Sequence, residues 1–132
     1  MTRAGFWLVV VLLATGGASP AAYAVVGGCT EVTEIDATSA QTTTELSTVR
    51  ARVCGVHLVA TGANAFCQVY ESPEGEDPSH GQARTVAEPA AATSGNGEFV
   101  WFGDAGYITR PGFGLGARAA RGRCFVQWSQ TP

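Results

Sequence analysis

Residues 52–71, RVCGVHLVATGANAFCQVYE, give the clearest indication of the fold. Two runs rich in valine, aromatic and cysteine residues flank residues 61–64, whose glycine and asparagine are typical of turns. Because β-branched and aromatic side chains favour strands, the stretch predicts two antiparallel strands joined as a β-hairpin. Both faces of the first strand become apolar after Cys54, which predicts a central strand covered on both sides.

The rest of the chain repeats this texture of short apolar runs broken by Gly, Pro and Asn. A tight turn is predicted at residues 94–97 (SGNG), and a final hairpin turn at residues 120–122. No amphipathic helix is predicted after residue 24. About seven or eight short strands, spaced roughly 8 to 12 residues apart, predict an all-β fold, an antiparallel β-sandwich or a small jelly roll.

The N-terminal segment, residues 1–24, has the layout of a secretory signal peptide and is expected to form a signal-like helix. Arg3 precedes an apolar run, and Ala22-Tyr23-Ala24 forms an Ala-x-Ala site before Val25. The apolar run is about 11 residues, short of the ~20 that span a bilayer. We therefore expect a cleaved leader, with an uncleaved hydrophobic leader as the alternative, and no stable membrane span after cleavage.

Beyond the leader, the sequence predicts two parts. Residues 25–48 are polar and rich in threonine, which predicts an N-terminal arm or an edge strand. Residues 49–132 are assigned to the β-sandwich domain.

Four cysteines follow the leader, and an even number in an exported chain predicts disulfides rather than metal ligands. In a hairpin with a two-residue loop, Cys54 and Cys67 would lie about 13 Å apart, too far for a bridge. One of them is therefore expected to pair with Cys124 and the other with Cys29, although the spacing does not choose the connectivity. Disulfides predict an extracellular, periplasmic or cell-surface location.

Catalytic and metal-binding arrangements are not predicted. Cys54 and His57 would lie on opposite faces of one strand, so they cannot share a zinc ion. The acidic stretch 71–81 is predicted to be a solvated surface loop. A calcium site formed by its residues Glu71, Glu74, Glu76, Asp77 and His80 is the less favoured alternative.

Glycosidase-like carboxylate pairs, Glu88 with Glu98 or Asp104 with Glu71, are the remaining enzymatic alternative. We expect no enzyme activity and no cofactor, because about 108 residues leave little room for a sizeable cleft. The net charge of −3 argues against nucleic acid as a partner.

Residues 98–102, EFVWF, form the most hydrophobic stretch after the leader. Phe99 and Trp101 are predicted to point to one face of a strand, and Val100 and Phe102 to the other. Trp101 belongs either to the core or to a binding surface.

Glycines that alternate along residues 113–119 predict the close approach of another backbone or of a large ring, such as that of Trp101 or Trp128. Arginines give the C-terminal third a basic edge, which either keeps strand edges from pairing or docks identical subunits head to tail. The candidate contact residues are Trp101, Tyr107, Arg110, Arg118, Arg121 and Arg123.

Between residues 50 and 128 the layout resembles the small β-sandwich modules of tailed-phage and gene-transfer particles. The resemblance is carried by RVCGVHLVA (52–60), the turn TGA (61–63), CQVY (67–70), FGDAGYI (102–108), GFGL (112–115) and a last strand ending in Trp128. It implies a β-sandwich that serves as a head decoration, spike or fibre-base domain.

We therefore expect a non-enzymatic structural or surface-recognition module, of the virion decoration or spike type. The alternative is a secreted bacterial binding or inhibitor domain stabilised by disulfides. The expected partner is a protein or a surface glycan, with self-association as a further alternative.

Overall fold

The protein is a two-layer β-sandwich. A computed structural model describes residues 28–75, 81–103 and 105–131, and the predicted leader lies outside this part of the chain. Within the described residues there are ten strands and no helix, hence no helix long enough to cross a membrane. The strands are β1 (Glu31–Asp36), β2 (Thr42–Ser47), β3 (Ala51–Ala60), β4 (Ala65–Pro73), β5 (Arg84–Ala87), β6 (Ala90–Ala91), β7 (Gly97–Trp101), β8 (Tyr107–Ile108), β9 (Phe113–Ala120) and β10 (Gly122–Gln130).

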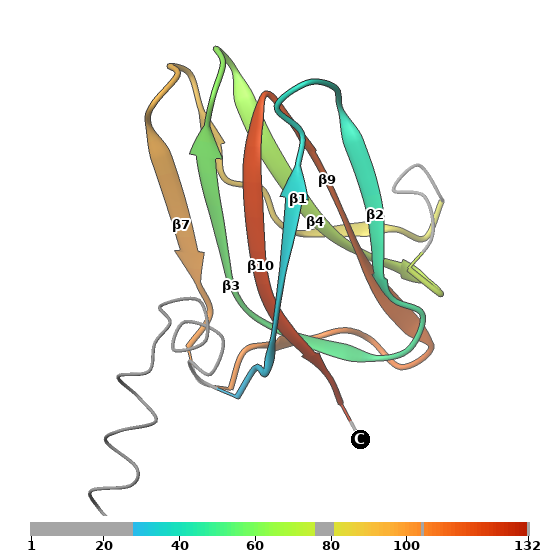
Figure 1. The fold of residues 1–132 in the computed structure, drawn as a ribbon. Helices are drawn as coiled ribbons and strands as arrows, with labels where there is room; N and C mark the ends of the chain where they lie inside the picture. Colours follow the sequence, from blue (N-terminus) through green and yellow to red (C-terminus); the bar gives the residue numbers. More distant parts are fainter. Residues whose placement is uncertain (1–27, 76–80, 104, 132) are drawn as a thin grey trace, which may run out of the picture.

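Two antiparallel sheets form the layers (Figure 1). Sheet A has the order β1-β10-β3-β7, with β8 pairing with β3, and sheet B has the order β2-β9-β4-β5, with β6 pairing with β4. The sandwich prediction is confirmed, and β3 is central in sheet A as expected. Residues 31–47 contribute an edge strand to each sheet, so they belong to the sandwich. The described residues form ten strands rather than the expected seven or eight. The two-residue strands β6 and β8 are too short to show an alternating pattern in the sequence.

The predicted hairpin at residues 52–71 is wrong, because β3 belongs to sheet A and β4 to sheet B. Both edges of β3 are occupied, by β10 on one side and by β7 and β8 on the other. The turn donates its Thr61 and Gly62 N–H groups to the carbonyl of Arg121, and Asn64 adopts a positive φ of 58°. Residues 61–64 therefore carry the chain from one layer to the other.

The final hairpin prediction fails for the same reason, since β9 lies in sheet B and β10 in sheet A. Arg121, between them, has a φ of 59° and donates its N–H to the carbonyl of Ala37 in the β1–β2 connection. The β6–β7 connection lies at the same end, because Gly95 donates its N–H to the carbonyl of Ala60. Four chain crossings thus meet at one end of the sandwich, the upper end in Figure 1, and we call it the loop end.

The core lies between the two sheets. Sheet A contributes the fully buried side chains of Val56, Leu58 and Val126, and sheet B those of Val69 and Leu115. Because strand side chains alternate between faces, the apolar partners of each strand meet in one layer.

The disulfides are Cys67–Cys124 and Cys29–Cys54. The first joins β4 of sheet B to β10 of sheet A through the core, and the second ties the chain before β1 to β3. This confirms that Cys124 and Cys29 each bridge to one of the two remaining cysteines. The disulfides are compatible with an oxidising, exported environment.

Close approach over the glycines of β9 is confirmed, but the ring is neither Trp101 nor Trp128. A Cβ on Gly116 would lie 2.5 Å from the ring of Tyr70 on β4. A Cβ on Gly114 would lie 2.2 Å from the carbonyl oxygen of Ser47. Both glycines lie on the same face of β9, where they leave room for the Tyr70 ring at Gly116 and for the Ser47 backbone at Gly114.

Candidate recognition surface

Strand β7 presents two large aromatic side chains to solvent. Phe99 is 49% exposed and Trp101 is 41% exposed, whereas the intervening Val100 packs against the core together with Phe102. The two exposed rings are stacked, with their centroids 6.0 Å apart and an interplanar angle of 19°. The alternation predicted from the sequence is therefore present, with Trp101 on the outer face of sheet A rather than in the core.

The two rings pack against a glycine, Gly55, on the neighbouring strand β3. Gly55 of β3 lies opposite Trp101 in the register, and a Cβ there would lie 3.0 Å from the indole and 3.2 Å from the Phe99 ring. The rings thus rest on bare backbone, and the sheet holds them in place. They also provide the outer cover that was predicted for β3.

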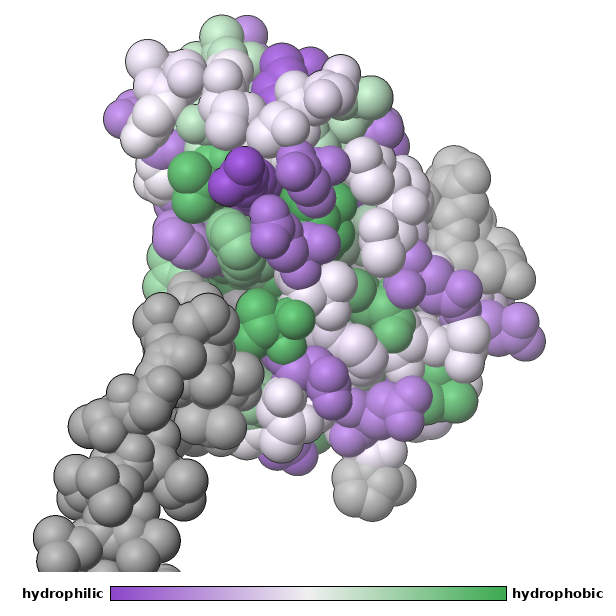
Figure 2. Space-filling view, viewed as in Figure 1, coloured by the Kyte–Doolittle hydropathy of each residue, from purple (hydrophilic) through white to green (hydrophobic). Residues whose placement is uncertain are grey.

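The aromatic pair continues across the sheet into a row of rings. His57 of β3 lies opposite Phe99 on one side and Phe125 of β10 on the other, at centroid distances of 5.8 and 6.1 Å. We call Phe99, Trp101, His57 and Phe125 the aromatic surface. Figure 2 shows this side of the molecule, where hydrophobic and hydrophilic residues are interleaved.

The far end of the same row is charged. Glu34 of β1 lies opposite Phe125, and its carboxylate is 3.7 Å from the Nε of Arg123. Both side chains are about half exposed, so this ion pair adds little stability, about 0–1 kcal/mol. Asp36, on the same strand, has a pKa below its usual value because the Thr38 hydroxyl and N–H donate to it. The outer face of sheet A therefore changes from aromatic side chains at β7 to charged side chains at β1.

Buried beneath this surface is an amide with an unused acceptor. Gln127 lies between Val32 and Gly55 in the register and is only 2% exposed. Its Oε1 is buried and accepts no hydrogen bond from the described residues. The strand pairing shifts register directly after this residue.

Glu71 was predicted to lie in a surface loop, but it is fully buried in β4. Its carboxylate pairs with the Arg110 guanidinium and also accepts from the Arg110 N–H and from the Tyr107 hydroxyl, each at 3.1 Å. Burial and the adjacent carboxylate raise the pKa of Tyr107. Arg110 also stacks over Phe113, 3.8 Å from the ring centroid. Two predicted contact residues, Tyr107 and Arg110, thus satisfy a buried carboxylate.

The other predicted arginines do not gather on one edge. Arg118 points from β9 toward Gln68 on sheet B, Arg121 donates twice to the carbonyl of Asn64 at the loop end, and Arg123 lies on sheet A. Positions 118 and 123 belong to different sheets because the chain crosses between layers at Arg121. The linear cluster of arginines is therefore dispersed over two faces and one end.

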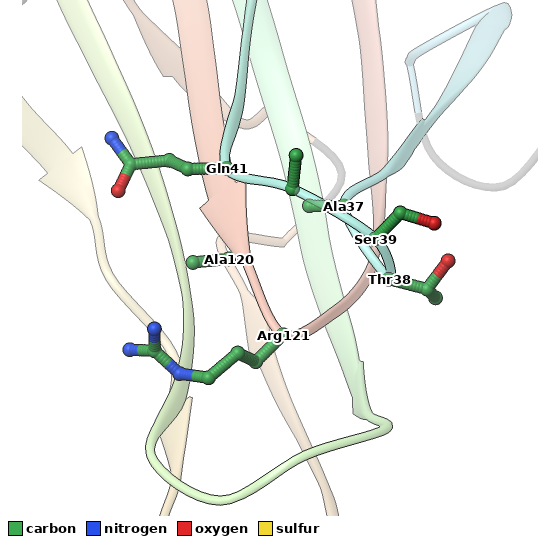
Figure 3. Close-up of a pocket in the computed structure, with 7 residues that line it drawn as sticks. Ala37, Thr38, Ser39, Gln41, Ala120 and Arg121 are labelled. Carbon is green, nitrogen blue, oxygen red and sulfur yellow. The ribbon is translucent and has the colours of Figure 1, made fainter.

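A shallow pocket of about 160 Å³ lies at the loop end (Figure 3). Its lining is formed by Ala37, Thr38, Ser39, Ala40, Gln41, Ala120 and Arg121. The Thr38 and Ser39 hydroxyls point away from the Arg121 guanidinium in Figure 3, and that guanidinium already donates to the carbonyl of Asn64. Sites for drug-sized ligands usually enclose about 300–1,000 Å³, so this pocket is a poor candidate.

Two of the candidate catalytic carboxylates, Glu98 and Glu71, are engaged in hydrogen bonds within the described part of the chain. No group of three or more His, Cys, Asp or Glu side chains there is placed to hold a metal ion. Glu98 accepts the N–H of Ala90 at 2.7 Å, and Glu71 is committed to Arg110. Residues 76, 77, 80 and 104, which completed the calcium and carboxylate alternatives, lie outside the described residues.

The fold and the surface together define a disulfide-stabilised β-sandwich with an exposed aromatic row on one sheet. Comparison of the chain with protein-family models, curated proteins and solved structures gave no match.

Proposed function

We propose that this chain is an exported, non-enzymatic recognition module that binds its partner through the aromatic surface. The observation that carries the proposal is the stacked pair Phe99 and Trp101, about half exposed on an edge strand and seated on Gly55. Large aromatic side chains contribute most of the energy at many interfaces, and rings already held in place lose little entropy on binding.

The partner class is a protein or a surface glycan. Both are recognised by flat, amphipathic rings, and the tryptophan indole N–H can supply a hydrogen bond. The disulfides favour export over assembly of a virion in a reducing cytoplasm. A virion decoration or spike role, which the sequence resemblance implied, has no separate support at this site.

Removal of either ring tests the proposal. Trp101→Ala and Phe99→Ala should each weaken binding of the purified chain to its target by about tenfold or more, because each deletes a central contact. Target binding is measured on a glycan array and on immobilised bacterial cells, with wild type as the reference.

Val49→Ala is the matched control, since Val49 is equally exposed, at 49%, but lies outside the aromatic surface. It should bind as wild type does. Equal binding by wild type and both ring variants would contradict the proposal, provided that all the proteins unfold at similar denaturant concentrations.

A further inference from the structure

Strand β7 is an open edge of sheet A. It pairs with β3 on one side, and in the part of the chain that the structure describes no strand pairs with its other side (Figure 1). An unpaired edge displays a row of backbone donors and acceptors that another strand can join.

The direction of the β7 backbone groups follows from the hydrogen bonds at its two ends. Ala60 donates its N–H to the carbonyl of Asn96, and Phe102 donates to the carbonyl of Cys54. In an antiparallel pair such bonded positions recur at every second residue, and the β3–β7 register has no shift. The N–H and C=O groups of Gly97, Phe99 and Trp101 therefore point to the open edge.

This edge also has less protection than the others. Strand β1 carries three acidic residues, and irregular pairing interrupts the contacts of β2 and β5 with their neighbours. Charges and bulges of this kind keep edges from pairing. The sequence of β7, GEFVW, holds one charge, Glu98, which is already bonded to the Ala90 N–H.

The side chains of β7 are complementary to a second copy of the strand. An antiparallel pair with its two-fold axis at Phe99 places Trp101 opposite Gly97 of the partner subunit. This repeats the arrangement inside the chain, where Trp101 lies opposite Gly55. The single charge, Glu98, falls opposite Val100 of the partner subunit, so no like charges face each other. The same operation on β1, with its axis at Glu34, would set Glu34 opposite Glu34 of the partner subunit, which is repulsive.

We propose that two copies of this chain associate through their β7 edges, as an antiparallel pair centred on Phe99. Sheet A then continues from one subunit into the other, and both aromatic surfaces lie on one face. The inference rests on the proposed function only in treating Phe99 and Trp101 as contact residues. The β7 edge has five residues, whereas a standard interface of about 1,600 Å² involves about 20–30 residues on each side. The dimer should therefore be weak, and its fraction should rise with protein concentration.

A proline substitution distinguishes the contribution of the edge backbone to dimerisation from that of the Phe99 ring. Phe99→Pro and Phe99→Ala both delete the ring, but only Phe99→Pro removes the edge N–H, and proline is tolerated at edge positions of this kind. Sedimentation velocity of the full chain over a wide concentration range should show a monomer–dimer equilibrium for wild type. Phe99→Ala should dimerise about tenfold more weakly, and Phe99→Pro should remain monomeric.

A cysteine substitution tests the register even if Phe99→Pro fails to fold. Opposed residues in a hydrogen-bonded pair have Cα atoms about 5.5 Å apart, within the range that a disulfide spans. Phe99→Cys should therefore form a covalent dimer in a glutathione buffer, whereas Val49→Cys, equally exposed, should not.

Monomeric wild type at every concentration, dimerisation of a folded Phe99→Pro, or no covalent dimer of Phe99→Cys would overturn the inference. If wild type stays monomeric while Trp101→Ala still loses glycan or cell binding, the proposed function stands alone. If wild type dimerises but Trp101→Ala and Phe99→Ala bind targets normally, the proposed function is contradicted and the self-association stands.

Discussion

Glu71 is the residue whose role differs most from its appearance in the sequence. It precedes a run of polar residues, yet its side chain is fully buried and accepts from Arg110 and Tyr107. The last residues of a strand and the first residues of a loop look alike in sequence, because both are polar. The buried pairing depends on Arg110, 39 residues away along the chain, which no local pattern reveals.

Replacing Glu71 with alanine should therefore destabilise the fold by about 1–3 kcal/mol, since the change leaves the Tyr107 hydroxyl and the Arg110 N–H without their buried acceptor. Urea unfolding measures the effect. Glu45→Ala, at an exposed position on β2, is the control and should change the free energy of unfolding by less than about 0.5 kcal/mol. Equal effects of the two substitutions would contradict the role assigned to Glu71.

At the scale of elements, the pairing of β9 with β4 depends on a glycine. Tyr70, buried on β4, lies directly opposite Gly116, and its ring fills the space where a Cβ would stand. The sequence correctly predicts that something large covers β9. It does not identify Tyr70, because alternation defines the face of a strand and leaves the neighbouring strand open.

Gly116→Ala should consequently destabilise the protein by about 1–3 kcal/mol, because the added methyl group overlaps the buried Tyr70 ring, which must move. The matched control is Gly81→Ala, where a Cβ would meet no atom within 4 Å. Thermal unfolding of the two variants measures the difference. A Gly116→Ala protein as stable as the Gly81→Ala protein would show that the ring relocates freely.

The crossings between sheets are a second feature at this scale. Turn residues at 61–64 and 120–122 were correctly placed, but both turns join different layers. Asn and Gly are favoured in either kind of turn because both adopt positive φ angles. What decides between a hairpin and a crossing is whether the flanking strand already has neighbours on both edges, as β3 does.

At the scale of the whole molecule, two disulfides hold the sandwich together at different points. Cys67–Cys124 joins the sheets through the core and closes a separation of 57 residues, while Cys29–Cys54 closes a separation of 25. The longer loop restricts the unfolded chain more, by about 4 kcal/mol against about 3.5 kcal/mol in the chain-entropy model.

Paired Cys→Ala substitutions should reflect this order. Loss of Cys67–Cys124 should lower the free energy of unfolding more than loss of Cys29–Cys54, because it releases the longer loop. Guanidinium unfolding of the two double variants, with the remaining bridge oxidised, measures the two values. The reverse order would show that the chain before β1 matters more than the inter-sheet bridge.

Local sequence patterns are enough to predict an antiparallel β-sandwich or small jelly roll, pairing of the cysteines across long separations, and a shared face for Phe99 and Trp101. These properties follow from side-chain chemistry and from the two-residue period of a strand, which are local. The choice of neighbouring strands, the burial of Glu71, the dispersal of the arginines and the contact of the exposed rings with Gly55 emerge only in the folded molecule. Those outcomes depend on contacts between residues distant in the chain, where many pairings satisfy the same local pattern and packing selects one.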